Sequence, residues 1–245
     1  MTQDRASGCV CASLSLAGQP TPIRPSLTAN HENLATAGAS RQPGRDMYRP
    51  YMGSQASVLA ESADAAIDTV LGFVNTRFDG KGGRIERFGS VADFTAWAGE
   101  RGLIRRETVS ESEVVAAREL RSALVTVLLA HADHPDVTGE RLAAAERFLD
   151  HAGSLYPVRI TLSARGSTVA AQSRGAAGVF GAVLAAANEI VQHDGWARMK
   201  GCCSPPCQHA FVDRTKNGAQ RFCAPKCASR AAMRAMRERH RDAAD

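Results

Sequence analysis

Apolar residues recur at helical spacing through most of the chain between residues 57 and 197. The clearest run begins at Ser110 and ends at His131. Its apolar positions lie three or four residues apart, which predicts one buried face of a long helix: Val114, Ala117, Leu120, Leu124, Val127 and Leu128. Ser110 and Glu113 have the spacing of a capping box, so the helix is expected to begin there.

Four further segments show the same period and are predicted to be helical: residues 57–78, Ser90–Gly102, Thr138–Gly153 and 175–199. A glycine-rich turn, DGKGGR, follows the first of them. In the second, Phe94, Trp97 and Leu103 are expected to be buried. In the last, Gly178 and Gly181 allow close packing against a neighbouring element.

The period changes to two between Tyr156 and Ser173, where Val158, Ile160 and Leu162 alternate with polar residues. This pattern predicts two strands joined by a turn around Arg165 and Gly166. Residues 57–197 are therefore predicted to form one mostly α-helical domain with a small β-hairpin. The predicted fold class is α+β, with a second, smaller module after residue 197.

Residues 1–56 are rich in Ser, Pro, Gly, Ala, Thr and Gln and lack a sustained apolar period. Such a composition predicts disorder, or an extension that the natural protein lacks, with Met47 or Met52 as the natural start. Cys9 and Cys11 in this segment are interpreted as free thiols.

The charge of the chain is concentrated at its C-terminal end. From Arg198 onward there are eleven Lys/Arg against four Asp/Glu, whereas residues 1–197 contain nineteen against twenty-one. A localised positive charge favours a polyanionic partner, nucleic acid first. We find no apolar run of about 18–20 residues and no convincing secretory signal, so no membrane partner is expected and the protein is predicted to be cytoplasmic.

Five of the seven cysteines lie between Cys202 and Cys227. In a reducing compartment such a cluster indicates metal binding rather than disulfides. One cysteine pair is Cys202 or Cys203 with Cys207, and the other is Cys223 with Cys227. Two short pairs are typical of structural zinc, and four thiolates leave no open position for catalysis. Zinc also explains how a segment with so few apolar side chains can fold.

The segment between and after the cysteine pairs predicts a treble-clef-like zinc finger in residues 198–245. Asn217-Gly218 is typical of a tight hairpin turn, here between Ala210–Val212 and Arg221–Phe222. Pro225 suits the first turn of a helix, which would carry the last cysteine. His209 and His240 are weaker candidate ligands.

The helix after the cysteines is predicted to bind DNA. Five basic residues fall on one stripe of it, and three more on the hairpin extend the same surface: Lys226, Arg230, Arg234, Arg237 and Arg241, with Arg214, Lys216 and Arg221. The alternatives are a protein-interaction adaptor that binds an acidic partner, a solvated basic helix, and RNA binding, which few aromatic residues disfavour. The chain lacks a phosphate-cradling glycine motif, and an enzyme is not predicted.

Residues 199–241 resemble the CGNR zinc finger. The residues that match its pattern are Cys202, Cys207, Phe211, Asp213, Thr215, Asn217, Phe222, Cys223, Cys227 and Arg230. The resemblance favours Cys202 over Cys203 as the ligand. The family's CGNR motif reads CASR here, and the last cysteine pair is separated by three residues, fewer than in much of the family.

The upstream region resembles the ABATE domain. The stretch TVLGFVNTRF, with Asn75 and Thr76, is similar to that family's Leu-Asp-Phe-Val-Asn-Thr motif, although Gly72 stands at the Asp position. The resemblance implies a bacterial, chiefly actinobacterial, stress-induced transcription regulator. Our own hypothesis is that the helical domain senses a small-molecule or protein signal or forms a homodimer. Asn75 and Thr76 either contact a small ligand or tie down the glycine loop, and we favour the second interpretation.

Overall fold

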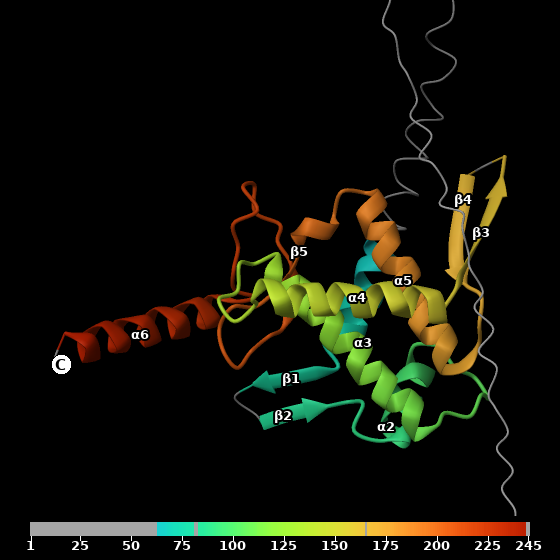
Figure 1. Ribbon diagram of the computed structural model, residues 1–245, viewed down its shortest axis with the longest axis horizontal. Helices are drawn as coiled ribbons and strands as arrows, with labels where there is room; N and C mark the ends of the chain where they lie inside the picture. Colours follow the sequence, from blue (N-terminus) through green and yellow to red (C-terminus); the bar gives the residue numbers. More distant parts are fainter. Residues whose placement is uncertain (1–62, 81–82, 165, 244–245) are drawn as a thin grey trace, which may run out of the picture. The chain divides into compact units, whose positions relative to one another are not determined.

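The structure is a computed structural model that describes residues 63–80, 83–164 and 166–243 (Figure 1). The expectations for residues 1–56, including the free thiols Cys9 and Cys11 and a start at Met47 or Met52, lie outside the described residues. The described residues are mostly helical. Three antiparallel pairs of short strands lie between successive helices in the chain. The predicted fold class, a mostly helical domain followed by a cysteine-rich module, is confirmed.

The predicted helices are present, and the three with predicted caps begin there, but the helix predicted over 175–199 ends at Gln192. The helical segments are residues 63–74, α2 (Val91–Glu100), α3 (Glu111–Ala130), α4 (Gly139–Leu155), α5 (Gly175–Gln192) and α6 (Pro225–Asp242). The hydroxyls of Ser90 and Thr138 accept the backbone N–H groups of Asp93 and Arg141. Ser110 forms the complete capping box that its spacing predicts.

The first hairpin corrects the predicted course of the first helix. That helix ends at residue 74, and β1 (Arg77–Gly80) then pairs with β2 (Gly83–Glu86). The physical reason is local: the Thr76 hydroxyl donates to the carbonyl of Phe73 and ends the helix, and two glycines flank the turn. The region predicted as a simple glycine-rich turn is therefore a short hairpin.

The core lies around α3 and is built from large apolar side chains. Phe73, Phe88, Phe94, Trp97 and Phe180 are all buried and meet at tilted or edge-to-face angles. The ring centroids of Phe88 and Trp97 lie 5.0 Å apart. Such pairs contribute beyond their buried area, so this cluster fixes how the first helix, α2 and α5 pack together.

The second hairpin, β3 (Val158–Ser163) and β4 (Gly166–Ala171), has the predicted turn and packs on α5. A Cβ added at Gly181 would lie 3.1 Å from the Cβ of Ala171, so the predicted close packing of α5 occurs there. By length and hydropathy α5 could cross a membrane, with a mean hydropathy of 1.3, but half of it is buried inside this fold. One half of α5 therefore belongs to the core of this fold.

The last sheet joins the helical domain to the cysteine-rich segment. After the 3₁₀ turn Trp196–Arg198, β5 (Met199–Gly201) pairs with β6 (Ala210–Val212) and lies on α3. A Cβ added at Gly201 would approach the Leu129 side chain to 2.7 Å, so glycine is needed at this contact. The cysteines thus begin directly after a strand that is fixed to the core.

Candidate metal centre

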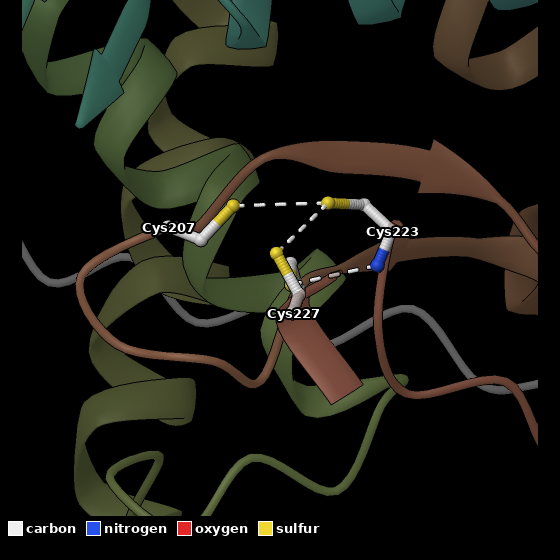
Figure 2. Close-up of side chains that lie close together, drawn as sticks. Cys207, Cys223 and Cys227 are labelled. Atoms are coloured by element: carbon white, nitrogen blue, oxygen red, sulfur yellow. Dashed lines mark hydrogen bonds between the residues drawn. The ribbon is translucent and has the colours of Figure 1, made fainter. Parts of the chain in front are cut away.

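Four cysteines from separate segments meet in the C-terminal module. Cys202 directly follows β5, Cys207 lies in the loop before β6, Cys223 precedes α6, and Cys227 lies in the first turn of α6. Their sulfur atoms all lie within 4.8 Å of one another. Figure 2 shows the thiols of Cys207, Cys223 and Cys227 converging.

The spacing of the sulfurs fits a tetrahedral metal site. The Cys207 and Cys223 sulfurs lie 3.7 Å apart, and those of Cys223 and Cys227 lie 3.8 Å apart (Figure 2). A disulfide would need about 2.05 Å. A tetrahedron with metal–sulfur bonds of about 2.3 Å has edges of about 3.8 Å, which agrees with the observed distances. These two distances, in a group of four sulfurs that all lie within 4.8 Å of one another, fit a thiolate-bound metal.

The ionisation of the thiols also favours a cation among them. A hydrogen bond from Cys207 lowers the pKa of Cys202 to about 5, although burial opposes the shift. The same hydrogen bond raises the pKa of Cys207, and burial followed by the charge of Cys202 raises the pKa of Cys223 to about 12. Without a cation the thiolate of Cys202 thus disfavours ionisation of Cys207 and Cys223, whereas a divalent ion would stabilise thiolates at the site.

The other candidate ligands lie outside this cluster. The Cys203 thiol is buried and donates to the carbonyl of Ala132 at 3.3 Å. Spacing left Cys202 and Cys203 as alternatives, and the structure brings Cys202 to the other sulfurs. His209 is half-buried beside β6, and His240 is exposed in the last turn of α6. Neither belongs to the group of atoms that meet.

A buried carboxylate organises the loop between the two cysteine pairs. Asp213 accepts hydrogen bonds from the Lys200 ammonium (2.9 Å), the backbone N–H and hydroxyl of Thr215 (2.9 and 2.5 Å) and the backbone N–H of Gln220 (2.9 Å). Lys200 also donates to the carbonyl of Gly218. Burial would raise the pKa of Asp213, but these hydrogen bonds hold it well below its usual range. The loop is therefore ordered around one ionised side chain.

The predicted hairpin around Asn217-Gly218 is wrong. Gly218 does turn the chain, with a φ of 64°. However, the strand Ala210–Val212 pairs with Met199–Gly201 and not with Arg221–Phe222. The physical reason is that the carboxylate of the loop binds the nearby N–H groups, so the chain folds into a compact loop instead of a second strand. The first cysteine pair consequently lies within the β5–β6 hairpin.

Asn75 and Thr76 are both engaged in contacts within the chain. The Asn75 amide donates to the carbonyl of Ala210 (3.0 Å) and accepts its N–H (2.8 Å). It thus ties the first helix to β6, not to the glycine loop. The Thr76 hydroxyl donates to Phe73 (2.7 Å) and accepts from Arg121 (3.0 Å).

The predicted basic surface lies mostly in solvent. Its exposed members are Lys226, Arg234, Arg237, Arg241, Arg214, Lys216 and Arg221, and Arg230 is half-buried. Arg234 donates to the carbonyl of Pro205 at 3.3 Å. The guanidinium of Arg221, although the residue is exposed, donates to the carbonyls of Ala132 (3.2 Å) and Asp133 (2.9 Å) in the loop between α3 and α4.

Sequence reasoning missed the ion pair between Arg121 and Glu86. Arg121 is 4% exposed, and both of its terminal nitrogens donate to Glu86, at 2.6 and 2.7 Å. The signal was present: Arg121 lies four residues after Ala117 on the apolar stripe of α3. Lys200, buried in β5, was missed as well, and no periodic signal marks it in so short a strand.

The helical domain and the cysteine-rich module each match a known protein family. Residues 67–194 match the ABATE family, described as "Putative stress-induced transcription regulator", and residues 198–240 match the CGNR zinc finger. A comparison with curated proteins finds no match. The first match covers more than half of the chain, and the four-sulfur cluster lies in the second. The chain therefore belongs to the ABATE family and carries a CGNR zinc finger after its ABATE domain.

Proposed function

We propose that the chain is a zinc-dependent, DNA-binding transcription regulator of the bacterial cytoplasm that acts in a stress response. The ABATE domain, residues 57–197, would receive a signal or form a homodimer, and the finger, residues 198–245, would hold DNA in the nucleoid. The observation that carries the proposal is the basic stripe of α6, which is joined to the metal centre through Cys227 in its first turn.

Zinc is the ion that the site favours, through Cys202, Cys207, Cys223 and Cys227. Four sulfur donors with tetrahedral spacing suit Zn²⁺, which binds thiolates without a redox change. All four positions are filled by protein, so the ion would be structural. Its role is to fix the start of α6 relative to the loop that carries Arg214 and Lys216.

The stripe on α6 has the geometry of a phosphate-binding surface. Successive members are spaced four, four, three and four residues, so at 3.6 residues per turn they fall within an arc of about 80°: Lys226, Arg230, Arg234, Arg237 and Arg241. The helix contains six Lys/Arg against two Asp/Glu. Backbone phosphates attract such a surface regardless of sequence, and a helix can enter the major groove. Arg221 instead would anchor the finger to the helical domain.

Much of α6 has no protein surface to pack on in the described chain, which supports a macromolecular partner. Beyond the metal centre it runs away from the helical domain (Figure 1). A helix of this length is marginally stable in water unless it is packed or bound. Neutralisation of its like charges by a polyanion would stabilise it.

A protein-interaction adaptor is the second candidate because two exposed methionines flank the stripe. Met233 is 57% exposed and Met236 is 53% exposed. Methionines on a helix are adaptable contacts for a protein groove. RNA binding is weaker, because Phe211 is buried and Phe222 half-buried, so neither phenylalanine of the finger is presented for base stacking.

Fluorescence anisotropy with random duplex DNA tests the proposal. The zinc-loaded protein should bind with a steep salt dependence, and a chelator should abolish binding. Arg230→Glu with Arg234→Glu should weaken binding and lower the salt slope by about 2. The matched control is Arg147→Glu with Arg159→Glu, two exposed arginines of the helical domain. Unchanged affinity in the first double variant, at full zinc content, would favour the adaptor.

A further inference from the structure

The β3–β4 hairpin presents an apolar strand to solvent. Eight large apolar side chains are exposed among the described residues, and three of them lie on β3: Val158 (38%), Ile160 (63%) and Leu162 (78%). They alternate with other residues along the strand, so all three point to the same face of the hairpin. A single exposed apolar residue is ordinary in a soluble protein, whereas a row of three on one face indicates an interaction surface.

This apolar row lies on the face of the hairpin that packs on α5. Val158 is paired with Ala171 of β4, and directly paired residues have their side chains on the same face. Ala171 lies against Gly181 of α5, so the whole row is on the α5 side. However, α5 packs mainly on β4, and β3 is the outer strand of the hairpin (Figure 1). The helix therefore covers the inner face of β4 and leaves that of β3 open.

The backbone of the same three residues is open at the edge of the sheet. Among the described residues, β3 pairs only with β4. At the base of the hairpin the N–H of Gln172 donates to the carbonyl of Pro157 at 3.0 Å, so these two residues form a hydrogen-bonded pair. Hydrogen-bonded and non-hydrogen-bonded pairs alternate along an antiparallel ladder. Val158, Ile160 and Leu162 therefore direct their N–H and C=O groups outward, away from β4.

We propose that β3 pairs with β3 of a second copy of this chain, so that two hairpins form one antiparallel sheet in the order β4-β3-β3-β4. A two-fold axis at Ile160 pairs each Val158 with Leu162 of the other copy, and every such pair exchanges two backbone hydrogen bonds. The two apolar rows then meet in the centre of the sheet, with one α5 on either side. A homodimer is one of the roles proposed above for the ABATE domain, and this interface rests on that role and not on DNA binding.

The charge of β3 favours this register. Arg159 is the one charged residue of the strand, and its side chain lies on the face opposite the apolar row. An axis at Ile160 places Arg159 opposite Thr161 of the second copy. An axis at Arg159 would instead place two arginines directly opposite each other, which is destabilising. The strand is thus complementary to itself in polarity and in charge.

The expected dimer is small and therefore reversible. Each β3 strand has six residues, whereas a standard interface uses about 20–30 residues from each partner. We therefore expect a dissociation constant of about micromolar or weaker. Such a dimer carries two fingers related by the two-fold axis, so its DNA site would be an inverted repeat, a consequence that rests on the function proposed above.

Sedimentation velocity of the full-length, zinc-loaded protein without DNA, from about 1 to 300 µM, tests the proposal. Wild-type protein should shift from monomer to dimer as its concentration rises. Ile160→Lys should weaken dimerisation by at least about tenfold, because two lysines would lie opposite each other at the axis. Val115→Lys, the same change at an exposed apolar residue of α3, is the matched control and should alter the dissociation constant less than about twofold. Thr161→Glu should tighten the dimer by about threefold, because each new carboxylate would lie opposite Arg159 of the other copy.

Hydrogen exchange at residue resolution distinguishes strand pairing from other contacts. The outward amides of Ile160 and Leu162 should exchange rapidly in dilute protein and become protected as the dimer forms. The amide of Thr161, which faces β4, should change less.

Three results would overturn the proposal: a monomer at every concentration, equal dimerisation of Ile160→Lys and Val115→Lys, or protection of the Ile160 and Leu162 amides that does not depend on concentration. The last result would mean that another segment of the same chain covers the edge of β3. A protein that dimerises through β3 but binds no DNA would contradict the function proposed above without affecting this inference.

Discussion

The ABATE domain and the finger are stabilised by different means. The core of the first contains five buried aromatic rings and the leucines of α3. The buried cluster of the second consists of Cys202, Cys207, Phe211 and Cys227, so three of its four members are candidate metal ligands. Burying one large apolar side chain contributes about 1.5–3 kcal/mol. The single buried phenylalanine of this cluster therefore cannot stabilise a folded module without a further contribution. The comparison implies that the part of the finger beyond β5 and β6 folds only with a bound metal.

The two regions nevertheless share a boundary that belongs to both. Met199 of β5 and Ala210 of β6 are part of the apolar core of the helical domain. Asn75, in the turn directly after the first helix, binds the backbone of Ala210. The base of the finger is therefore fixed to the core by ordinary packing, whereas its outer part, with α6, depends on the metal centre. This division gives an order of expected effects.

The largest effect is expected from loss of a metal ligand. Cys227→Ser should abolish zinc binding, because the fourth thiolate is lost, and should unfold the loop after β6 together with α6. Structural zinc contributes on the order of 10 kcal/mol, far more than the finger's apolar contacts. The ABATE domain should keep its helical circular dichroism. Elemental analysis measures the zinc content, and hydrogen exchange of residues 202–243 measures the unfolding of the loop and of α6.

Cys203→Ser is the matched control for this variant. Cys203 is buried, next to Cys202 in the chain, and its thiol contacts Ala132 instead of the other sulfurs. It should retain stoichiometric zinc and a protected α6. Stoichiometric zinc in Cys227→Ser would contradict the ligand assignment and the contrast between the two regions.

A smaller effect is expected from the aromatic core. Phe88→Ala removes a fully buried ring whose centroid lies 5.0 Å from both Phe94 and Trp97. The lost transfer energy and the remaining cavity should lower the free energy of unfolding of the ABATE domain by about 3–5 kcal/mol. Urea denaturation followed by circular dichroism measures this, and Val115→Ala, on the exposed face of α3, is the control. A loss below about 1 kcal/mol would mean that the cluster is not the main source of stability.

The same contrast explains what the sequence could predict. The apolar stripe and capping box of α3 are local signals, and both are confirmed. Strand pairing in the finger is a long-range choice, and the turn dipeptide Asn217-Gly218 could not show that a buried carboxylate, Asp213, binds the loop. Spacing also could not separate Cys202 from Cys203. Neighbouring side chains in extended chain point to opposite sides, and the sequence does not show which side faces the other cysteines. The contact between Asn75 and Ala210 spans 135 residues and leaves no local pattern.

The next effect concerns the boundary. Asn75→Ala removes two hydrogen bonds to Ala210 and leaves its nearly buried N–H and carbonyl without their partner. Each unsatisfied buried group costs about 1–3 kcal/mol. The finger should therefore open separately from the ABATE domain, and the Ala210 amide should exchange faster by hydrogen-exchange mass spectrometry.

Asp68→Ala is the control for this variant, because Asp68 is exposed on the same helix. It should leave the exchange of Ala210 unchanged. Unaltered exchange in Asn75→Ala would show that packing of β5 on α3 holds the boundary without the amide.

The smallest effect is a pH dependence that differs between the two regions. The finger should release its metal as acid protonates the thiolates. In the ABATE domain, burial acts to raise the pKa of Glu86. The hydrogen bonds from Arg121 act in the opposite direction and contribute to a pKa below the ordinary value of 4.5. A carboxyl with a lowered pKa adds stability above its unfolded pKa and loses it as pH falls through the folded value. For one group the slope is at most about 1.4 kcal/mol per pH unit.

Urea denaturation of the Cys227→Ser protein isolates this term, since no metal contributes. The contribution of Glu86 to the free energy of unfolding should be nearly constant from neutral pH to just above pH 4.5. At lower pH this contribution should decrease. Glu86→Gln in the same background cannot titrate, so its curve should be flatter in that range although its stability at neutral pH is lower. Parallel curves for the two proteins would mean that Glu86 is not ionised more readily in the folded state. The acid sensitivity of the ABATE domain would then have to come from other carboxyl groups.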